Sequence, residues 1–354
     1  MLFIFALFIF NCPFIYSLYL MDIRRILDKK TQKFHYIDRK SKKRVNKSLA
    51  KHINNLRIPP AYTKVKISKN KRSKVLAIGE DSKQRKQYIY NQEHIDKQKE
   101  LKFSDLIYFG KKIKRIRRDI LANIERCSKN STIRDKNCVI SIILFLIDRC
   151  NFRVGCDRYK KLYNSYGVTT LNKAHFEFKP NKVSIEFIGK KGVVNKSDVT
   201  HKNVCSVLQK LCYQNNKEYV FCYEHNGEVF RITERHINDY LKKYDKTLTV
   251  KMFRTWNANY ILLKEILNYD IPNDEKGAKK NINSIVKKAA ENLHHSNHVS
   301  KKSYMNNEII DLYMEQPIKF KRLVEFFRRK NGNLPTIGRL LNLILKFICD
   351  KKKN

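Results

Sequence analysis

Two residues that could take part in catalysis are His295 and Tyr304, which stand nine positions apart in a polar, basic segment. A tyrosine can act as a nucleophile and form a covalent intermediate. A free phenol is a weak nucleophile at neutral pH, because its pKa in water is about 10. Attack on a phosphodiester would therefore need cations to neutralise the charge that develops on the phosphate oxygens. Since the chain contains 19 Tyr and ten His residues, this segment alone favours an ordinary structural role for both.

Basic residues greatly outnumber acidic residues in the chain. Its 354 residues include 75 Lys and Arg against 33 Asp and Glu, a formal net charge of +42. A charge of this size indicates a polyanionic partner, and nucleic acid is the first candidate. A lysine-rich codon bias is a second, compatible explanation, because Asn and Ile are also frequent. With 42% hydrophobic residues the chain can form a core, and its length accommodates two domains.

The nine cysteines are scattered between Cys12 and Cys349 without a CxxC pair, and the closest two are Cys150 and Cys156. This spacing predicts neither a zinc site nor a disulfide framework, and it fits a reducing compartment.

The first 20 residues are almost wholly apolar. They lack the cationic start and the small-residue cleavage site of a secretory signal, although their length just suffices for a membrane anchor. The basic part of the chain opens with a second methionine, Met21. We hypothesise that Met21 is the working start, in which case no membrane association is expected; the mass of the native protein would decide this.

Residues 21–100 predict a small β-rich domain. The expected elements are strands at 34–38, 65–67, 75–78 and 87–90 and a helix at 48–56. Tyr88 and Tyr90 fall on one face of the last strand, because side chains alternate along a strand. Aromatic residues interleaved with Gln, Lys and Arg suit contacts with bases and phosphates. A strand with one solvated face explains these residues equally well.

Residues 101–354 predict a mostly helical domain, so the fold class is α+β. Apolar residues recur at helical spacing from Leu106, with Ser104 as the expected N-cap. Residues 139–147 are apolar on all sides and predict a buried helix, which would hold Arg153 rigidly beyond its end. Such an arginine suits an anion clamp or, more simply, a salt bridge. Further helices are expected at 204–211, 235–243, 250–260, 286–292, 308–314, 318–327 and 334–348, with a strand at 219–223.

Residues 182–198 predict a β-hairpin whose turn, Gly189–Gly192, presents Lys190. A lysine there could enter a DNA groove or donate a proton. Most lysines at hairpin tips are simply solvated.

Several separated blocks, in this order and spacing, make the chain resemble the type IB DNA topoisomerases of poxviruses, giant viruses and bacteria. The blocks are IPPAYT at 58–63, IGEDSKQRKQYIY at 78–90, FRVG at 152–155, FIGKKG at 187–192, KMFRTW at 251–256 and HHSNHVSKKSYM at 294–305. The resemblance implies that a β-rich N-terminal domain and a helical catalytic domain of the tyrosine recombinase/topoisomerase type close around duplex DNA as a clamp.

The resemblance also implies a role for each matching residue. Tyr304 would attack a DNA phosphodiester, form a 3′-phosphotyrosyl link and expel a 5′-hydroxyl. Arg153, Arg254 and His295 would contact the non-bridging oxygens, and Lys190 would be the general acid. The DNA contacts would be made by Gln87, Tyr88, Tyr90, His94, Tyr159 and Lys251.

The same resemblance predicts a monomer that needs no ATP, metal or other cofactor and works in the virion or at the cytoplasmic replication site of a large DNA virus. The chain departs from the usual pattern in two places. It has His-Ser-Asn where Gly-His-Thr-Pro is usual, with His294 adjacent to His295, and it has Lys191 where the poxvirus enzyme is acidic.

Two other classes of protein fit parts of the sequence. Tyrosine recombinases share the nucleophile and the arginines, but they usually have a histidine where this chain has Lys251, and a helical N-terminal domain. A non-catalytic, basic DNA-binding protein would explain the charge but not the spacing of the five candidate catalytic residues.

Overall fold

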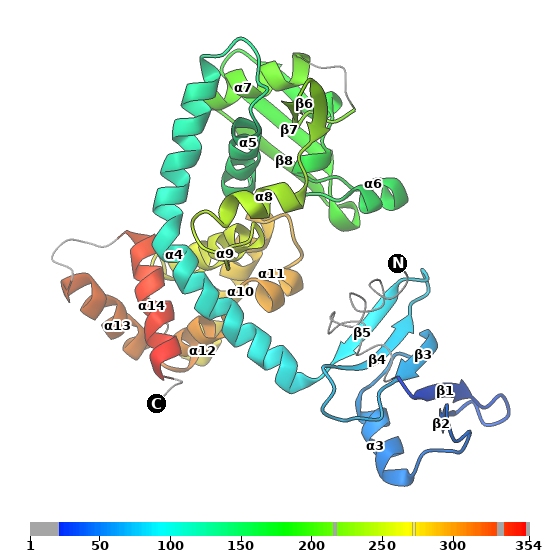
Figure 1. Ribbon diagram of the computed structural model, residues 1–354. Helices are drawn as coiled ribbons and strands as arrows, with labels where there is room; N and C mark the ends of the chain where they lie inside the picture. The colour runs from blue at the N-terminus through cyan, green and yellow to red at the C-terminus, as the bar shows by residue number, and fades with distance from the viewer. Residues whose placement is uncertain (1–20, 215–217, 271, 273, 331–335, 352–354) are drawn as a thin grey trace. The chain divides into compact units, whose positions relative to one another are not determined.

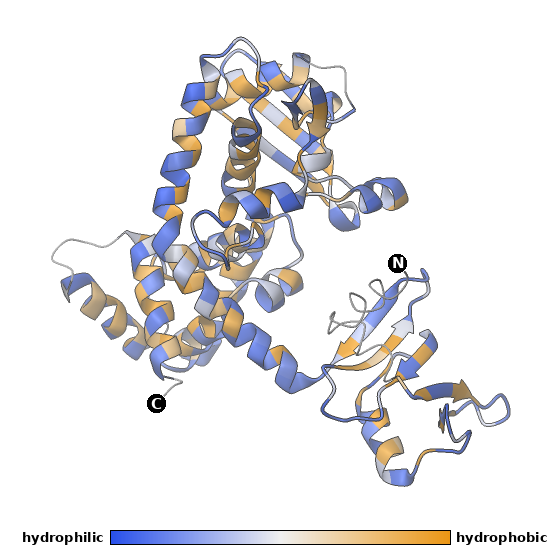
Figure 2. Ribbon diagram, viewed as in Figure 1, coloured by the Kyte–Doolittle hydropathy of each residue, from blue (hydrophilic) through white to orange (hydrophobic). Residues whose placement is uncertain are grey.

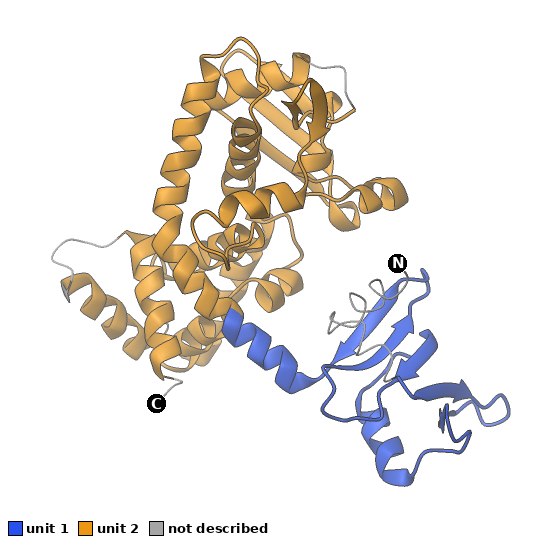
Figure 3. Cartoon of the chain, in the orientation of Figure 1, with its two compact units in different colours: residues 1–101 blue, residues 102–354 orange. Residues whose placement is uncertain are grey.

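The computed structural model describes residues 21–214, 218–270, 272, 274–330 and 336–351. The apolar segment 1–20 and the expectations placed on it lie outside these residues. The chain divides into two compact units, residues 1–101 and 102–354, shown in Figure 3. Each unit is described by itself.

Unit 1 is built on a five-stranded antiparallel sheet of order β2-β1-β3-β4-β5 (Figure 1). Its elements are β1 (Ile23–Leu27), β2 (Phe34–Asp38), α3 (Lys47–Asn55), β3 (Thr63–Ile67), β4 (Val75–Glu80) and β5 (Lys86–Tyr90). Leu49 and Ile53 of α3 pack with Ile23, Val65 and Ile67 of the sheet. The four expected strands and the expected helix are confirmed.

Strand β1 was not expected, because two consecutive arginines interrupt its apolar alternation. The structure shows what the second of them does. The Arg25 guanidinium donates to the carbonyls of Ile58 and Pro59 at 3.1 and 3.0 Å, and it also reaches the carbonyls of Pro60 and Tyr62. It therefore fixes the proline-containing segment, which lies outside the sheet ladder.

Helix α4 (Gln92–Ser128) begins well before the predicted N-cap, so the assignment of Ser104 as a helix start is wrong. The cap is Asn91, whose Oδ1 accepts from the N–H of Glu93 at 2.9 Å. The first three turns of α4 are rich in charged residues and have no buried apolar stripe, which is why the apolar period begins only at Leu106.

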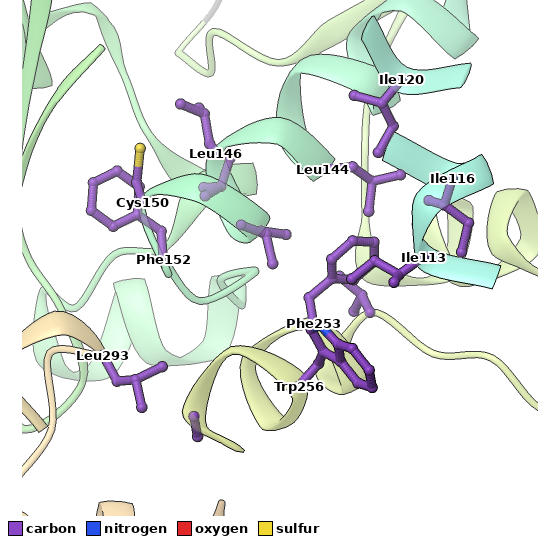
Figure 4. Close-up of a cluster of buried hydrophobic side chains, with 14 of the residues drawn as sticks. Ile113, Ile116, Ile120, Leu144, Leu146, Cys150, Phe152, Phe253, Trp256 and Leu293 are labelled. Carbon is purple, nitrogen blue, oxygen red and sulfur yellow. The ribbon is translucent and has the colours of Figure 1, made fainter. Parts of the chain in front are cut away.

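Unit 2 surrounds the buried helix α5 (Lys136–Arg149), which is hydrophobic over most of its length (Figure 2). Phe253 and Trp256 of α9 (Lys251–Ile266) belong to one cluster with Ile113 of α4 and Leu144 of α5 (Figure 4). The remaining helices are α6 (Asp157–Tyr163), α7 (Lys202–Tyr213), α8 (Glu234–Leu241), α10 (Glu275–Asn292), α11 (Asn297–Ser303), α12 (Asn307–Glu315), α13 (Pro317–Lys330) and α14 (Ile337–Lys351). The expected helices are present, apart from residues 334 and 335, which lie outside the described ranges.

The predicted hairpin is confirmed as β7 (Lys182–Ile188) and β8 (Val194–Val199), and a third strand, β6 (Phe176–Lys179), extends it. The expected strand at 219–223 lies slightly later, as β9 (Cys222–His225), and pairs with β10 (Glu228–Arg231).

The structure joins Cys127 at the end of α4 to Cys138 on α5 by a disulfide. The sequence predicted no disulfide framework, and this single pair was not expected either. Sequence spacing did not indicate it, because the two residues meet only when the two helices pack together.

Candidate active site

Tyr304 directly follows α11, in a segment that buried hydrogen bonds attach to α9. Its carbonyl accepts from Nδ2 of Asn259 at 2.8 Å. Asn259 is fully buried on α9, and its Oδ1 accepts from the N–H of Asn306 at 2.7 Å. The main chain around the tyrosine is thereby fixed to the helix that carries Arg254.

Arg254 is buried beside this tyrosine, with its Cζ 5.7 Å from the centroid of the Tyr304 ring. Its Nη2 donates to the carbonyl of Leu293 at 2.6 Å and contacts Nε2 of His295. Within the described part of the chain, its Nε and Nη1 have no hydrogen-bond partner. Burial lowers the pKa of Arg254 to about 10; repulsion from Arg153 acts in the same direction and Tyr304 opposes it. Buried donors of this kind normally have an acceptor, so these atoms indicate a ligand.

Arg153 lies in the loop between α5 and α6, and its Nη1 is also buried without a partner among the described residues. Burial lowers the pKa of Arg153, and interaction with Tyr304 raises it. The loop rests against Gly167: a Cβ there would lie 2.5 Å from the main chain of Gly155 and 2.7 Å from the carbonyl oxygen of Arg153. That carbonyl accepts from the N–H of Val168 at 2.8 Å.

His295 faces the tyrosine, with 4.6 Å between the centroids of its ring and the Tyr304 ring. The adjacent His294 instead contacts the carbonyl of Cys150 at 3.2 Å. Desolvation lowers the pKa of His295 to about 2, with further contributions from Arg254, Arg153 and His294. The imidazole is therefore neutral at physiological pH and can accept from the guanidinium of Arg254.

A cavity of about 380 Å³ brings most of the predicted catalytic residues together. Its walls include Arg153, Lys190, Lys251, Arg254 and Tyr304, together with Tyr159 of α6. Nζ of Lys190, in the hairpin turn, lies 5.6 Å from the centroid of the Tyr159 ring. Four cationic side chains thus share one cavity with the phenol.

The other predicted DNA contacts form a group within unit 1. The rings of Tyr88 and Tyr90 are stacked with centroids 6.2 Å apart, and the ring of His94 lies 6.2 Å from that of Tyr90. Gln87 donates to Asp81 at 2.9 Å. The prediction that the two tyrosines share a face is confirmed.

Three residues at the site were not predicted from the sequence: Asn259, Gly167 and Lys102. Nζ of Lys102 donates to the carbonyl of Ser303 and lies 5.8 Å from the centroid of the Tyr304 ring. Desolvation, with repulsion from Lys251, lowers the pKa of Lys102 to about 8. All three act through the main chain of distant residues, and no local motif marks such contacts.

The described residues contain no group of three or more His, Cys, Asp or Glu side chains that could hold a metal ion. Over the same ranges, no helix combines the length and the apolar character needed to cross a membrane.

Comparison with known proteins places the chain in a family. The family profile of the eukaryotic DNA topoisomerase I catalytic core matches residues 81–324, and that of the bacterial DNA topoisomerase IB N-terminal domain matches residues 33–81. The chain is 33% identical over 333 residues to the DNA topoisomerase 1B of Acanthamoeba polyphaga mimivirus, covering 91% of this chain and 95% of that protein. It is 26% identical over 248 residues to the DNA topoisomerase 1B of vaccinia virus (strain Copenhagen), covering 69% and 74%. These relatives come from large DNA viruses, and the chain belongs to the type IB DNA topoisomerase family.

Proposed function

We propose that the chain relaxes supercoiled duplex DNA through the cavity around Tyr304. The Tyr304 Oη attacks a backbone phosphorus, a 3′-phosphotyrosyl bond forms and the bond to the 5′-oxygen breaks. The free strand then rotates, and the 5′-hydroxyl reverses the reaction. Because the phosphotyrosyl bond conserves the energy of the broken bond, no ATP is consumed.

The observation that carries this proposal is the set of unpaired, buried guanidinium atoms beside the phenol. Nη1 of Arg153 and Nε and Nη1 of Arg254 have no acceptor among the described residues. A guanidinium binds the oxygens of a phosphate with short, charge-assisted hydrogen bonds. We assign both arginines to the non-bridging oxygens, where donors aimed at the developing charge lower the barrier most.

His295 and Lys190 complete the chemistry. We assign His295 to a non-bridging oxygen, because its ring lies against that of Tyr304. The negative phosphate would also favour a proton on this imidazole. Lys190 is assigned as the general acid for the leaving 5′-oxygen, a role typically worth 10²–10⁴-fold in rate. It is exposed in its turn and lines the cavity, so it can reach a substrate there.

DNA binding is assigned to both units, which we propose close around the duplex as a clamp. The stacked pair Tyr88 and Tyr90, with Gln87 and His94, would contact DNA from unit 1. Tyr159 and Lys251 would do so from unit 2, since both line the catalytic cavity. We further propose that the protein acts as a monomer, in the virion or at the cytoplasmic replication site of a large DNA virus. The family match gives the recombinase and architectural alternatives no support.

Plasmid relaxation in EDTA without ATP tests the function. The wild-type protein is expected to relax supercoiled plasmid, and Tyr304→Phe is expected to bind it without relaxing it. Tyr269→Phe is the matched control, because this exposed phenol is not among the residues that line the cavity and donates to Oγ of Ser284 at 3.1 Å. Relaxation by Tyr304→Phe at the wild-type rate would refute the assignment of the nucleophile.

A further inference from the structure

Cys156 stands in the wall of the catalytic cavity, three residues after Arg153. It occupies the N-cap position of α6, but its side chain does not cap the helix. Of the described cysteines outside the disulfide, Cys156 is exposed, whereas the others are buried or half-buried. A thiol with this access can react with small molecules that enter the cavity.

The cavity is also lined by cationic side chains that would attract anions toward this thiol. Arg254 is only 4% exposed, lines the same cavity and has Nε and Nη1 unpaired among the described residues. Lys190 and Lys251 add two further cations to the walls. Glu234 also lines the cavity, but the four cations Arg153, Lys190, Lys251 and Arg254 outnumber this one carboxylate, so the cavity carries a net positive charge. A concave site with a net positive charge raises the local concentration of anions.

We propose that Cys156 is a covalent modification site for small anionic electrophiles and disulfides, and that its adduct keeps DNA out of the cavity. With iodoacetate, the Sγ–C bond forms, the C–I bond breaks, iodide leaves and the thiol proton passes to solvent. With oxidised glutathione, Sγ attacks one sulfur, the S–S bond breaks and one glutathione leaves as a thiolate, so that added thiol reverses the exchange. The labelling follows from the cavity alone, whereas the loss of activity rests on the proposed function.

Labelling of the full chain with iodoacetate and with neutral iodoacetamide tests the site, with peptide mass spectrometry following each cysteine. Relative to free glutathione as the reference thiol, Cys156 is expected to favour the anionic reagent on the order of tenfold. Salt should reduce this preference, and sulfate should slow the labelling. Cys349, half-buried on α14, is the internal control and should show no such preference. If Cys156 and glutathione prefer iodoacetate over iodoacetamide to the same extent, or if another cysteine is the main site of labelling, the proposed modification site is refuted.

Relaxation after treatment with oxidised glutathione tests the consequence. Wild-type activity should fall in proportion to the Cys156 adduct measured by mass and return with dithiothreitol. Cys156→Ser should relax plasmid normally and resist the treatment. If Cys156→Ser relaxes plasmid slowly even without treatment, the test rests on the wild type, where the loss of activity should follow the amount of Cys156 adduct. Full activity of completely modified wild type would overturn the inference, whereas inactivity of untreated wild type would instead refute the proposed function.

Discussion

The side chain of Asn259 fixes the main chain of Tyr304 to the helix of Arg254, accepting from Asn306 while donating to the tyrosine carbonyl. Asn259→Ala should slow single-turnover DNA cleavage by about a hundredfold, because a displacement near 1 Å at a reacting group costs that much. It should also lower the free energy of unfolding by about 1–3 kcal/mol, since the buried N–H of Asn306 loses its acceptor.

The matched control is Asn281→Ala on α10, which removes a hydrogen bond to Tyr313 of 3.0 Å away from the cavity. It should affect stability without slowing cleavage. Normal cleavage by Asn259→Ala would show that the tyrosine does not need this attachment.

Gly167 allows the loop of Arg153 to approach it, so Gly167→Ala should displace that arginine. The added Cβ would meet main-chain atoms of Gly155 and Arg153, which cannot rotate away. We expect cleavage of bound DNA to slow by at least about tenfold, measured in single turnover, with a lower unfolding midpoint. Gly338→Ala is the control, because its Cβ would make only an ordinary contact of 3.6 Å with Trp256. Equal cleavage rates in the two variants would contradict the packing argument.

His295 should make folding stability depend on pH. The folded protein holds it neutral down to a pKa of about 2, whereas in the unfolded chain a histidine takes up a proton near pH 6.5. Below about pH 6.5 the unfolded state binds more protons, so the stability present above that pH is progressively lost as the pH falls. Between pH 7.5 and 5, the urea midpoint of the wild type should therefore fall further than that of His295→Gln. The exposed His298→Gln serves as the control, and parallel curves for wild type and His295→Gln would contradict the assignment.

Lys102 supplies a positive charge and a main-chain contact next to Tyr304, the proposed nucleophile, so Lys102→Met should slow cleavage by about tenfold with little change in DNA affinity. Because the pKa of Lys102 is about 8, the side chain is charged below pH 8 and loses its charge above it. The difference in cleavage rate between wild type and variant should therefore be largest below pH 8 and should shrink above it. Single-turnover rates from pH 6.5 to 9.5 measure this. Lys111→Met, on an exposed position of the same helix, should match the wild type; a similar loss there would indicate a general effect of charge.

The sequence could predict the candidate residues Arg153, Lys190, Arg254 and Tyr304, which line one cavity in the structure, because each stands in a local block with its own spacing. It could not predict the residues that position them. The contact from Lys102 to Ser303 spans 201 residues and depends on how α4 packs within unit 2.

The errors in the predicted secondary structure have the same physical cause. The buried helix α5 was predicted correctly because residues 139–147 are apolar on all sides, and the hairpin was predicted correctly because apolar and polar residues alternate along its first strand. The first turns of α4 are rich in charged residues and strand β1 contains two consecutive arginines, so the stability of both elements comes from contacts that a local pattern does not encode. Arg25, bound to the carbonyls around Pro59, illustrates this for β1.

Covalent trapping on a DNA duplex tests the central claim most directly. The protein is incubated with the duplex in EDTA without ATP and quenched with detergent, and the adduct is mapped by peptide mass spectrometry. One strand should be joined through its 3′-phosphate to Tyr304, with a free 5′-hydroxyl on the other fragment. Replacing either Arg153 or Arg254 by Gln should suppress the adduct without abolishing binding. A link to another residue, a 5′-phosphate linkage, or full adduct formation without the arginines would contradict the proposed reaction.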